Sequence, residues 1–408
     1  MHVRRNIVKF SFLRCNNGLS RMDKQLVNDY VNSAASYARE ATRVCSRCGL
    51  CLSACTVYMS TRDPRLSPMS RLRAAAKVLN GGSFTDDDVL ALYTCNQCGA
   101  CTQVCPYAIE VLRVVHAARI VLASKGVYPE GLRKVSESAR RAGHSFTPNR
   151  EEPVKLLVEI AREVGIKPDE SADILYVPSP FETTVYPHVL RDTLLLFKKL
   201  GLSVTVSTRA LDSGGNVAID ANDLEAGFML LKACVEEAER LGARTVLLSQ
   251  CGADTKLVIL LYKLGVRLGG PRVANIYEFF AERGFRATCT NCILFTSCTF
   301  ARLDPKRSLE KTIVARKPRD KPPYTMCCGG AGGLNFLHEE PFASIRKRVY
   351  RWRFERLLKS AKGATIVLPC VKCYSVLRHG ALLAKKPTYP MKMYTSVALE
   401  EVSSASQP

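Results

Sequence analysis

The chain has 408 residues, of which 47% are hydrophobic and 24% charged, so its composition resembles that of a globular protein with two or three domains and excludes extensive disorder. Lys and Arg outnumber Asp and Glu by 59 to 37, a net charge of +22, which favours acidic partners or an anionic membrane surface. Because this charge is spread along the chain without an aromatic-interleaved basic motif, we expect no nucleic-acid partner.

Residues 1–21 form a basic amino-terminal extension that need not be ordered. They lack the long apolar stretch and the small-residue cleavage site of a secretory signal, so we expect a cytoplasmic protein. An amphipathic stretch from Lys24 to Thr42 then leads into the first cysteine motif. No apolar run reaches the roughly 18 residues of a membrane-spanning helix, so we expect any contact with the inner face of a membrane to be peripheral and made within a complex.

Eighteen cysteines are the most informative feature of the chain. Reducing compartments do not sustain a disulfide framework, so cysteines in this number indicate metal ligands. Eight of them form two copies of the run Cys-x2-Cys-x2-Cys-x3-Cys, which two-cluster ferredoxins use and which predicts two [4Fe-4S] clusters. The copies consist of Cys45, Cys48, Cys51 and Cys55, and of Cys95, Cys98, Cys101 and Cys105.

Crossed ligation is expected, because the fourth cysteine of each run is carried by the ongoing chain towards the other cluster. Gly49 and Gly99 occupy matching positions and permit tight turns around the sulfur atoms. Thr56 stands where the second copy has Pro106, which leaves the first turn less constrained. The predicted ligands are Cys45, Cys48, Cys51 and Cys105 for one cluster, and Cys95, Cys98, Cys101 and Cys55 for the other.

Structural zinc is the alternative at these motifs, but a four-cysteine run repeated whole has more thiolates than two tetrahedral zinc ions would arrange in this way. The segment between the motifs is predicted to be helical. Ser70 to Asn80 has helical periodicity, and Thr85 is an N-cap before three aspartates. Since small ferredoxins join their motifs by strands and turns, residues 22–150 resemble instead the α-helical ferredoxin domain of succinate dehydrogenase iron–sulfur subunits and of heterodisulfide reductase.

Beyond about residue 170, short apolar strands alternate with helices, which predicts an α/β architecture. The pattern occurs twice and looks like a diverged internal duplication. In residues 170–285 we expect strands at Asp173–Val177, Ser203–Val206 and Arg244–Leu248 and helices at Val189–Leu200 and Asp223–Leu241. In residues 286–400 we expect strands at Ile293–Thr296 and Thr365–Leu368 and a long helix at Pro341–Ala361.

The second unit carries another cysteine set, which includes the adjacent pair Cys327-Cys328 before a run of glycines. Adjacent cysteines bind one mononuclear metal only with strain, but they can ligate different irons of a cluster, and the glycines let the backbone approach sulfide. A third cluster site is therefore the economical interpretation. The glycine run does not fit the order strand, G-x-G-x-x-G, helix, so we expect no flavin or nicotinamide site.

Three segments, ILFTSCTFAR, MCCGGAGG and VLPCVKCYSVL, carry a family resemblance. They are similar to the CCG domains of heterodisulfide reductase catalytic subunits and of the iron–sulfur subunits of glycolate, lactate and anaerobic glycerol-3-phosphate dehydrogenases. The resemblance covers roughly residues 22–400 and implies a non-cubane [4Fe-4S] cluster or, as in some members, zinc. Either Cys289 or Cys292 could replace Cys298 as the first ligand of this cysteine set. The implied ligands are Cys298, Cys327, Cys328, Cys370 and Cys373.

The first unit departs from this family pattern. It has Asp212-Ser213-Gly214-Gly215 where the family has Cys-Cys-Gly, and only Cys251 remains as a matching cysteine. One cysteine and an aspartate do not hold a cluster, so we expect a degenerate, cluster-free scaffold, with Cys251 either near the site of the other unit or an inert buried thiol. We interpret the remaining candidates as unligated or structural, namely Cys15, Cys234, His116 and His338.

These features predict an iron–sulfur electron-transfer subunit of a redox complex. Without an organic cofactor site the chain passes single electrons and needs a partner, expected to be a flavoprotein or a membrane-bound quinone or haem subunit. One alternative is a heterodisulfide reductase-like catalytic subunit that reduces a disulfide at the non-cubane cluster, although the family's disulfide chemistry uses both cysteine sets. Another is a two-cluster carrier with a carboxyl-terminal zinc or scaffold domain.

Overall fold

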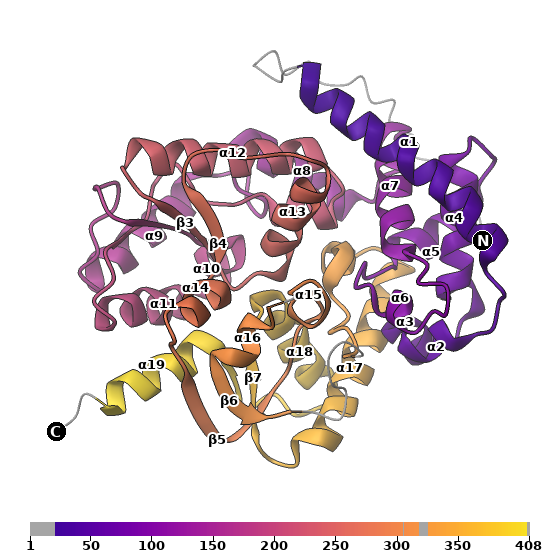
Figure 1. The fold of residues 1–408 in the computed structure, drawn as a ribbon. Coiled ribbons are helices and arrows are strands. Elements are labelled where there is room, and N and C mark those ends of the chain that lie inside the picture. Colours follow the sequence, from indigo (N-terminus) through magenta and orange to yellow (C-terminus); the bar gives the residue numbers. More distant parts are fainter. Residues whose placement is uncertain (1–20, 305, 318–324, 406–408) are drawn as a thin grey trace.

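The computed structural model describes residues 21–304, 306–317 and 325–405 (Figure 1). The extension expected over residues 1–21 lies outside this range apart from Arg21, where the first helix begins, and Cys15 lies outside it as well. Among the described helices, none combines the length and the apolar character needed to cross a bilayer.

The part that contains the two ferredoxin motifs is helical, as expected for the segment between them. Ser67 caps α4, whose first residue is Pro68, and Thr85 and Asp88 form a capping box at the start of α5. The apolar faces of these helices pack into a common core. The elements are α1 (Arg21–Val44), α2 (Leu50–Ala54), α3 (Thr56–Thr61), η1 (Pro64–Leu66), α4 (Pro68–Leu79), α5 (Asp86–Tyr93), α6 (Ala100–Gln103) and α7 (Val111–Ser124).

The first α/β unit contains a four-stranded parallel sheet of order β2-β1-β3-β4. The three strands expected here are confirmed, whereas β4 was missed because its four residues include Arg272 and Asn275 and show no apolar run. The strands are β1 (Ile174–Val177), β2 (Val204–Thr205), β3 (Thr245–Leu248) and β4 (Arg272–Asn275). The helices around it are α8 (Glu130–Ala142), α9 (Glu151–Glu163), α10 (Pro180–Thr184), α11 (Pro187–Lys199), the π-helix η2 (Asn216–Asp220), α12 (Leu224–Arg240), α13 (Gly252–Lys263) and α14 (Ile276–Glu282).

The second unit repeats this topology with a parallel sheet of order β6-β5-β7-β8. The shared strand order supports the duplication that the sequence indicated. The strand expected at Ile293–Thr296 was wrong at both ends, because β5 starts earlier, in a polar segment that pairs irregularly with β6. The strands are β5 (Ala287–Leu294), β6 (Ile313–Arg316), β7 (Thr365–Leu368) and β8 (Met391–Met393). The helices are α15 (Cys298–Arg302), α16 (Ser308–Lys311), η3 (Ala331–Phe336), α17 (Phe342–Ala361), α18 (Val371–Leu383) and α19 (Tyr394–Ala405).

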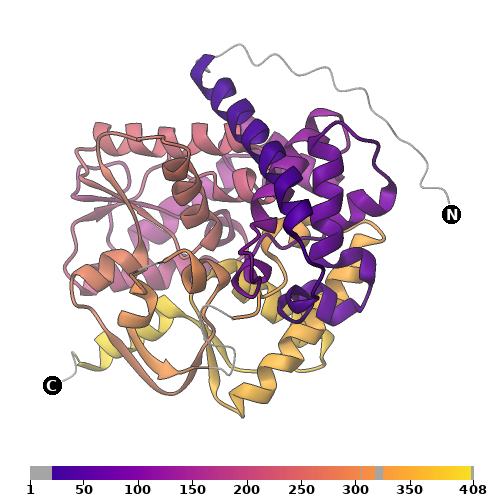
Figure 2. The ribbon, with the colours of Figure 1, turned by 45° about the vertical axis from the view of Figure 1, so that its right-hand side comes forward.

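The helical part packs against both α/β units, as Figure 2 shows from the side on which it comes forward. Helix α3 contacts α17, α5 contacts η3, and α1 contacts α12. The fully buried Arg119 of α7 joins these parts, because its guanidinium donates to the carbonyls of Cys95 (2.7 Å) and Gly332 (2.6 Å). The segments that hold cysteines therefore meet in the middle of the molecule.

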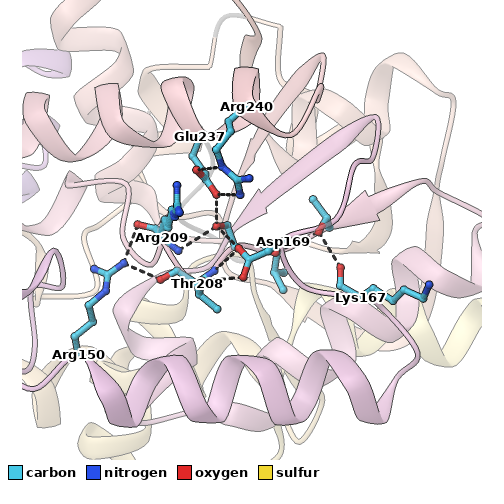
Figure 3. Close-up of polar contacts among 10 residues, drawn as sticks. Arg150, Lys167, Asp169, Thr208, Arg209, Glu237 and Arg240 are labelled. Atoms are coloured by element: carbon cyan, nitrogen blue, oxygen red, sulfur yellow. Dashed lines mark hydrogen bonds and ion pairs between the residues drawn. The ribbon is translucent and has the colours of Figure 1, made fainter.

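A polar network anchors the segment that follows β2 (Figure 3). Asp169 accepts hydrogen bonds from the backbone N–H and the hydroxyl of Thr208, at 3.0 and 2.8 Å. Arg150 donates to the carbonyl of Thr208 at 2.7 Å, and Arg240 pairs with Glu237 at 2.7 Å. These bonds fix the path of the chain into the Asp212-Ser213 segment.

Candidate metal centres

Two hollows in the helical part are each lined by four of the eight ferredoxin cysteines. The grouping is the one that crossed ligation predicts, since each hollow takes three cysteines from one motif and the last cysteine of the other. The outer hollow is lined by Cys45, Cys48, Cys51 and Cys105. The inner hollow is lined by Cys55, Cys95, Cys98 and Cys101.

The backbone has the same special geometry in both motifs. Gly49 and Gly99 have φ of 80° and 72°, as expected for tight turns around sulfur. Arg47 and Gln97, two residues earlier, are also left-handed, with φ of 57° and 45°, a feature that the sequence did not signal. Such alternation turns backbone N–H groups inwards, and the N–H of Gln97 lies 3.4 Å from the sulfur of Cys95.

The two hollows differ in their exposure. Cys48 of the outer hollow is exposed, whereas Cys55 and Cys95 of the inner hollow are buried. The buried Arg71 donates to the sulfur of Cys55 at 3.1 Å and to the carbonyl of Ala91 at 3.0 Å. Arg71 was missed by the sequence analysis, since a single arginine in a helical pattern gives no local signal of its partner.

The structure also brings together the five cysteines of the second unit, named here the CCG set. All five are buried, and they come from the starts of α15 and α18 and from the segment before η3. Cys327 faces both Cys298 and Cys328, and Cys373 faces both Cys328 and Cys370. The resulting chain of thiols is formed by Cys298, Cys327, Cys328, Cys373 and Cys370.

The glycines after Cys328 fit the close approach expected of them. Gly329 has φ of 107°, and a Cβ atom there would lie 2.5 Å from Val349. A Cβ atom at Gly330 would lie 2.2 Å from Val376. The N–H of Gly329 points at the sulfur of Cys327, at 3.4 Å. Only glycine allows the backbone to fold this tightly over the thiols.

The donor chemistry of the two hollows suits iron–sulfur clusters. Each hollow is lined by four cysteines, and in a cluster each thiolate binds a different iron. The thiol-lined hollows and the bare glycine backbone therefore fit iron–sulfur clusters.

The inner hollow lies directly against the CCG set. The thiols of Cys98 and Cys327 face each other, and the hydroxyl of Thr56 donates to the carbonyl of Cys327 at 3.1 Å. Arg302 donates to the carbonyl of Cys98 at 3.0 Å. Figure 1 places α3 and α6, which flank the inner hollow, on the side of the helical part that faces the second unit.

Lys256 of α13 is a buried cation at this junction. Its ammonium donates to the carbonyl of Gln97 at 3.1 Å. Burial opposes its charge, but the sulfurs of Cys298, Cys327 and Cys98 more than compensate and raise the pKa of Lys256. The positive charge of Lys256 thus interacts with cysteines of both the inner hollow and the CCG set. The sequence held no signal for this role, because Lys256 belongs to the unit without a cysteine set.

The first unit keeps the backbone of a cysteine site without its thiols. Asp212 is buried and accepts from the backbone N–H groups of Ser145 and Gly214, both at 2.8 Å. Asp254 follows Cys251 by three residues, as Cys373 follows Cys370, and burial together with the charge of Asp212 raises the pKa of Asp254 to about 8. This agrees with the expectation that Cys251 is the only matching cysteine of the first unit, since the position that corresponds to Cys373 is the aspartate Asp254.

Cys251 lies beside the CCG set. The N–H of the next residue, Gly252, donates to the sulfur of Cys370 at 3.4 Å, and Lys372 forms a buried ion pair with Asp220 between the two units. Cys251 is thus close to the site of the other unit, and it is also fully buried, as expected of an inert thiol.

The remaining candidates lie away from these sites. Cys289 and Cys292 are bonded to each other in β5, and Cys298 lies beside Cys327. Cys234 is buried in α12, and His116 is buried in α7. His338 lies between η3 and α17 and contacts Arg346 at 3.0 Å.

Comparison with known proteins agrees with this geometry. Residues 41–109 match the family model of the 4Fe-4S dicluster domain. An Hdr-like menaquinol oxidoreductase iron–sulfur subunit of Archaeoglobus profundus is 29% identical over 245 residues, which cover 51% of this chain and 43% of the relative. An iron–sulfur subunit of the CoB–CoM heterodisulfide reductase of Methanocaldococcus jannaschii is 24% identical over 155 residues, 36% of this chain and 75% of the relative.

A probable glycolate oxidase iron–sulfur subunit of Bacillus subtilis is 30% identical over 97 residues, 23% of this chain and 22% of the relative. The chain spans less than half the length of the Archaeoglobus relative that it matches. The matched cysteine domain is the part in which both hollows lie. Residues 41–109 are therefore similar to 4Fe-4S dicluster domains, and parts of the chain are similar to iron–sulfur subunits of Hdr-like menaquinol oxidoreductases and heterodisulfide reductases.

Proposed function

We propose that the chain is an iron–sulfur electron-transfer subunit of a heterodisulfide reductase-like redox complex. The observation that carries this proposal is the continuous order of three cysteine sites, from the outer hollow to the inner hollow to the CCG set, in which Cys98 of the inner hollow faces Cys327. Single electrons pass between centres that lie close together, and a buried route protects them from side reactions with solvent.

The ligands in this proposal are those that the cysteine motifs predicted. One [4Fe-4S] cluster is held by Cys45, Cys48, Cys51 and Cys105 and another by Cys55, Cys95, Cys98 and Cys101. The CCG set holds a third cluster, a non-cubane one. The first unit, residues 170–285, is a scaffold that covers this third site, and the redox partner is a flavoprotein or a quinone- or haem-containing subunit.

The chemistry that the clusters supply when bound is reversible one-electron transfer. The protein contributes charge and exclusion of water. Arg71, buried against Cys55, and Lys256, buried between the inner hollow and the CCG set, stabilise the additional negative charge of a reduced centre. The N–H groups of Gln97 and Gly329, which point at the sulfurs of Cys95 and Cys327, also stabilise negative charge there.

The test is the content of iron, sulfide and zinc together with electron paramagnetic resonance on anaerobically purified protein. We expect about twelve irons per chain in the unmodified protein and about eight in the C327S/C328S double variant. The matched control is C234S, which changes a buried cysteine outside all three sites and should retain about twelve.

Other outcomes separate the competing functions. About eight irons in both proteins, with zinc lost from the double variant, would indicate a two-cluster carrier with a zinc site. Turnover of a small disulfide by the protein with a reduced dye, lost in the double variant, would favour a disulfide reductase. Fewer than about eight irons in the unmodified protein would contradict the electron-transfer proposal as a whole.

A further inference from the structure

Three large apolar side chains are exposed around the mouth of the outer hollow. Val44, Leu50 and Tyr107 are 41%, 51% and 53% exposed. Leu50 and Tyr107 line the hollow together with Cys48, and Val44 precedes Cys45, another lining residue, directly in the chain. Clustered apolar exposure of this kind indicates a surface that another molecule covers.

The clustering is specific to this place among the described residues. The other large apolar side chains with comparable exposure each lie on a different part of the molecule and beside no cysteine site. They are Val185 after α10, Met229 on α12, Tyr262 on α13, Val314 on β6 and Leu382 on α18. Singly exposed apolar residues are ordinary, so only the group at the outer hollow requires an explanation.

The rim of this apolar surface is basic. Residues 43–53 and 103–109, which carry the surface, contain Arg43 and Arg47, both exposed, and no Asp or Glu. The next residue, Glu110, lies 3.8 Å from Arg113 and is matched by it. An apolar centre with a basic rim is complementary to a partner whose contact area is apolar and ringed by carboxylates.

We propose that Val44, Leu50 and Tyr107, with Arg43 and Arg47, form the docking surface for a redox protein with an acidic rim around a cofactor at its own surface. The inference rests on the proposed function, because the outer hollow is the cysteine site farthest from the CCG set along the series. Lipid headgroups offer acidic groups but neither donate nor accept electrons, so we favour a protein.

The electron balance of the step is simple. One electron leaves the reduced cofactor of the partner and reduces one oxidised cluster in this chain, or moves in the opposite direction. No bond of this chain forms or breaks. Docking shortens the distance between the two cofactors and does not change the chemistry at either.

The probe is a reduced, acidic flavodoxin, whose flavin donates one electron, mixed with the oxidised cluster-containing protein in a stopped-flow spectrometer. We expect the reduction rate to fall with salt in the unmodified protein. It should fall at least about tenfold in R43E/R47E, because charge reversal removes electrostatic attraction between the surfaces. L50S/Y107S should also be slower, by loss of apolar contact. The control Y262S/R267E, which changes an exposed aromatic and an arginine on and after α13, should be unaffected.

Excess dithionite, added at the end, reports whether the clusters are present, independently of docking. Its failure to bleach the unmodified protein would contradict the proposed function itself. Normal bleaching with equal flavodoxin rates in all variants, or with no reduction of the unmodified protein by flavodoxin, would overturn the docking surface alone. Anionic vesicles that bind the unmodified protein but not R43E/R47E, together with equal flavodoxin rates, would overturn it in favour of a membrane contact.

Discussion

The two α/β units have the same parallel strand order but carry different side chains at corresponding positions. Where the second unit has Cys327-Cys328 and Cys370-x2-Cys373, the first has Asp212-Ser213 and Cys251-x2-Asp254. In the second unit the buried thiols face one another, whereas in the first the buried Asp212 is bound by the N–H groups of Ser145 and Gly214. One fold therefore supports either a thiol site or a hydrogen-bonded core.

The comparison also shows how the first unit still serves the site of the second. Lys256 and Gly252 belong to the first unit, yet they contact Gln97 of the inner hollow and Cys370 of the CCG set. The first unit, which has no set of thiols of its own, therefore supplies residues that cover the thiols of the second unit. These different roles of the two units can be tested by changing residues at corresponding positions.

The largest expected effect comes from the matched cysteines Cys251 and Cys370. We expect C370A to lose about four irons per chain, because it removes a proposed ligand of the third cluster, whereas C251A should retain about twelve. Iron and sulfide analysis of both variants checks this. Loss of iron in C251A would show that the first unit supplies a ligand after all.

The next effect is on stability, at Asp212. Its replacement by alanine leaves two buried N–H groups without an acceptor, and we expect the free energy of unfolding to fall by about 2 to 3 kcal/mol. Thermal unfolding followed by circular dichroism measures this, with the exposed Asp29→Ala change as control. An unchanged stability, or a loss of iron before unfolding, would argue against a purely structural role.

A smaller effect is expected at Lys256, which is shared by the inner hollow and the CCG set. K256M removes a buried positive charge, so the reduced state of the nearby centres becomes less stable. Their midpoint potentials should fall by about 60 mV, which corresponds to an about tenfold smaller equilibrium constant for reduction by one electron. Redox titration followed by electron paramagnetic resonance checks this. K256R should restore the potential, and K263M, on the exposed face of the same helix, should not change it.

The smallest effect concerns pH and His116, which links the helical part to the first unit. Its Nε2–H donates to the carbonyl of Ala218 at 3.0 Å and its Nδ1 accepts from Tyr30 at 3.1 Å. Burial lowers the pKa of His116 to about 4, below its unfolded value of about 6.5. The unfolded chain therefore binds the proton more readily, and stability is lost as pH falls below about 6.5.

Between pH 8 and 5.5 this histidine should account for about 1 to 2 kcal/mol of lost stability. Thermal unfolding of the unmodified protein and of H116Q across this range measures the difference, and it separates the histidine from any acid lability of the clusters. Equal pH dependence in both proteins would show that His116 does not contribute.

Much of the architecture followed from local pattern. Helices α4 and α5 begin where Ser67 or Thr85 caps them, and the buried strands β1, β3 and β7 are short apolar runs. The strands that the sequence analysis missed, β4, β6 and β8, lie at sheet edges, are only three or four residues long and each contain a charged residue. Their strand state depends on neighbours to pair with, which local sequence does not reveal.

The cysteine spacing by itself predicted the two four-cysteine motifs and their crossed grouping, because each motif is a local property of the chain, whereas the five members of the CCG set were implied by the family resemblance. Only the tertiary structure decided that the inner hollow faces the CCG set, that Cys98 approaches Cys327, and that Lys256 lies between them. These contacts join segments more than 150 residues apart, and their positions depend on how the helices and sheets pack against one another.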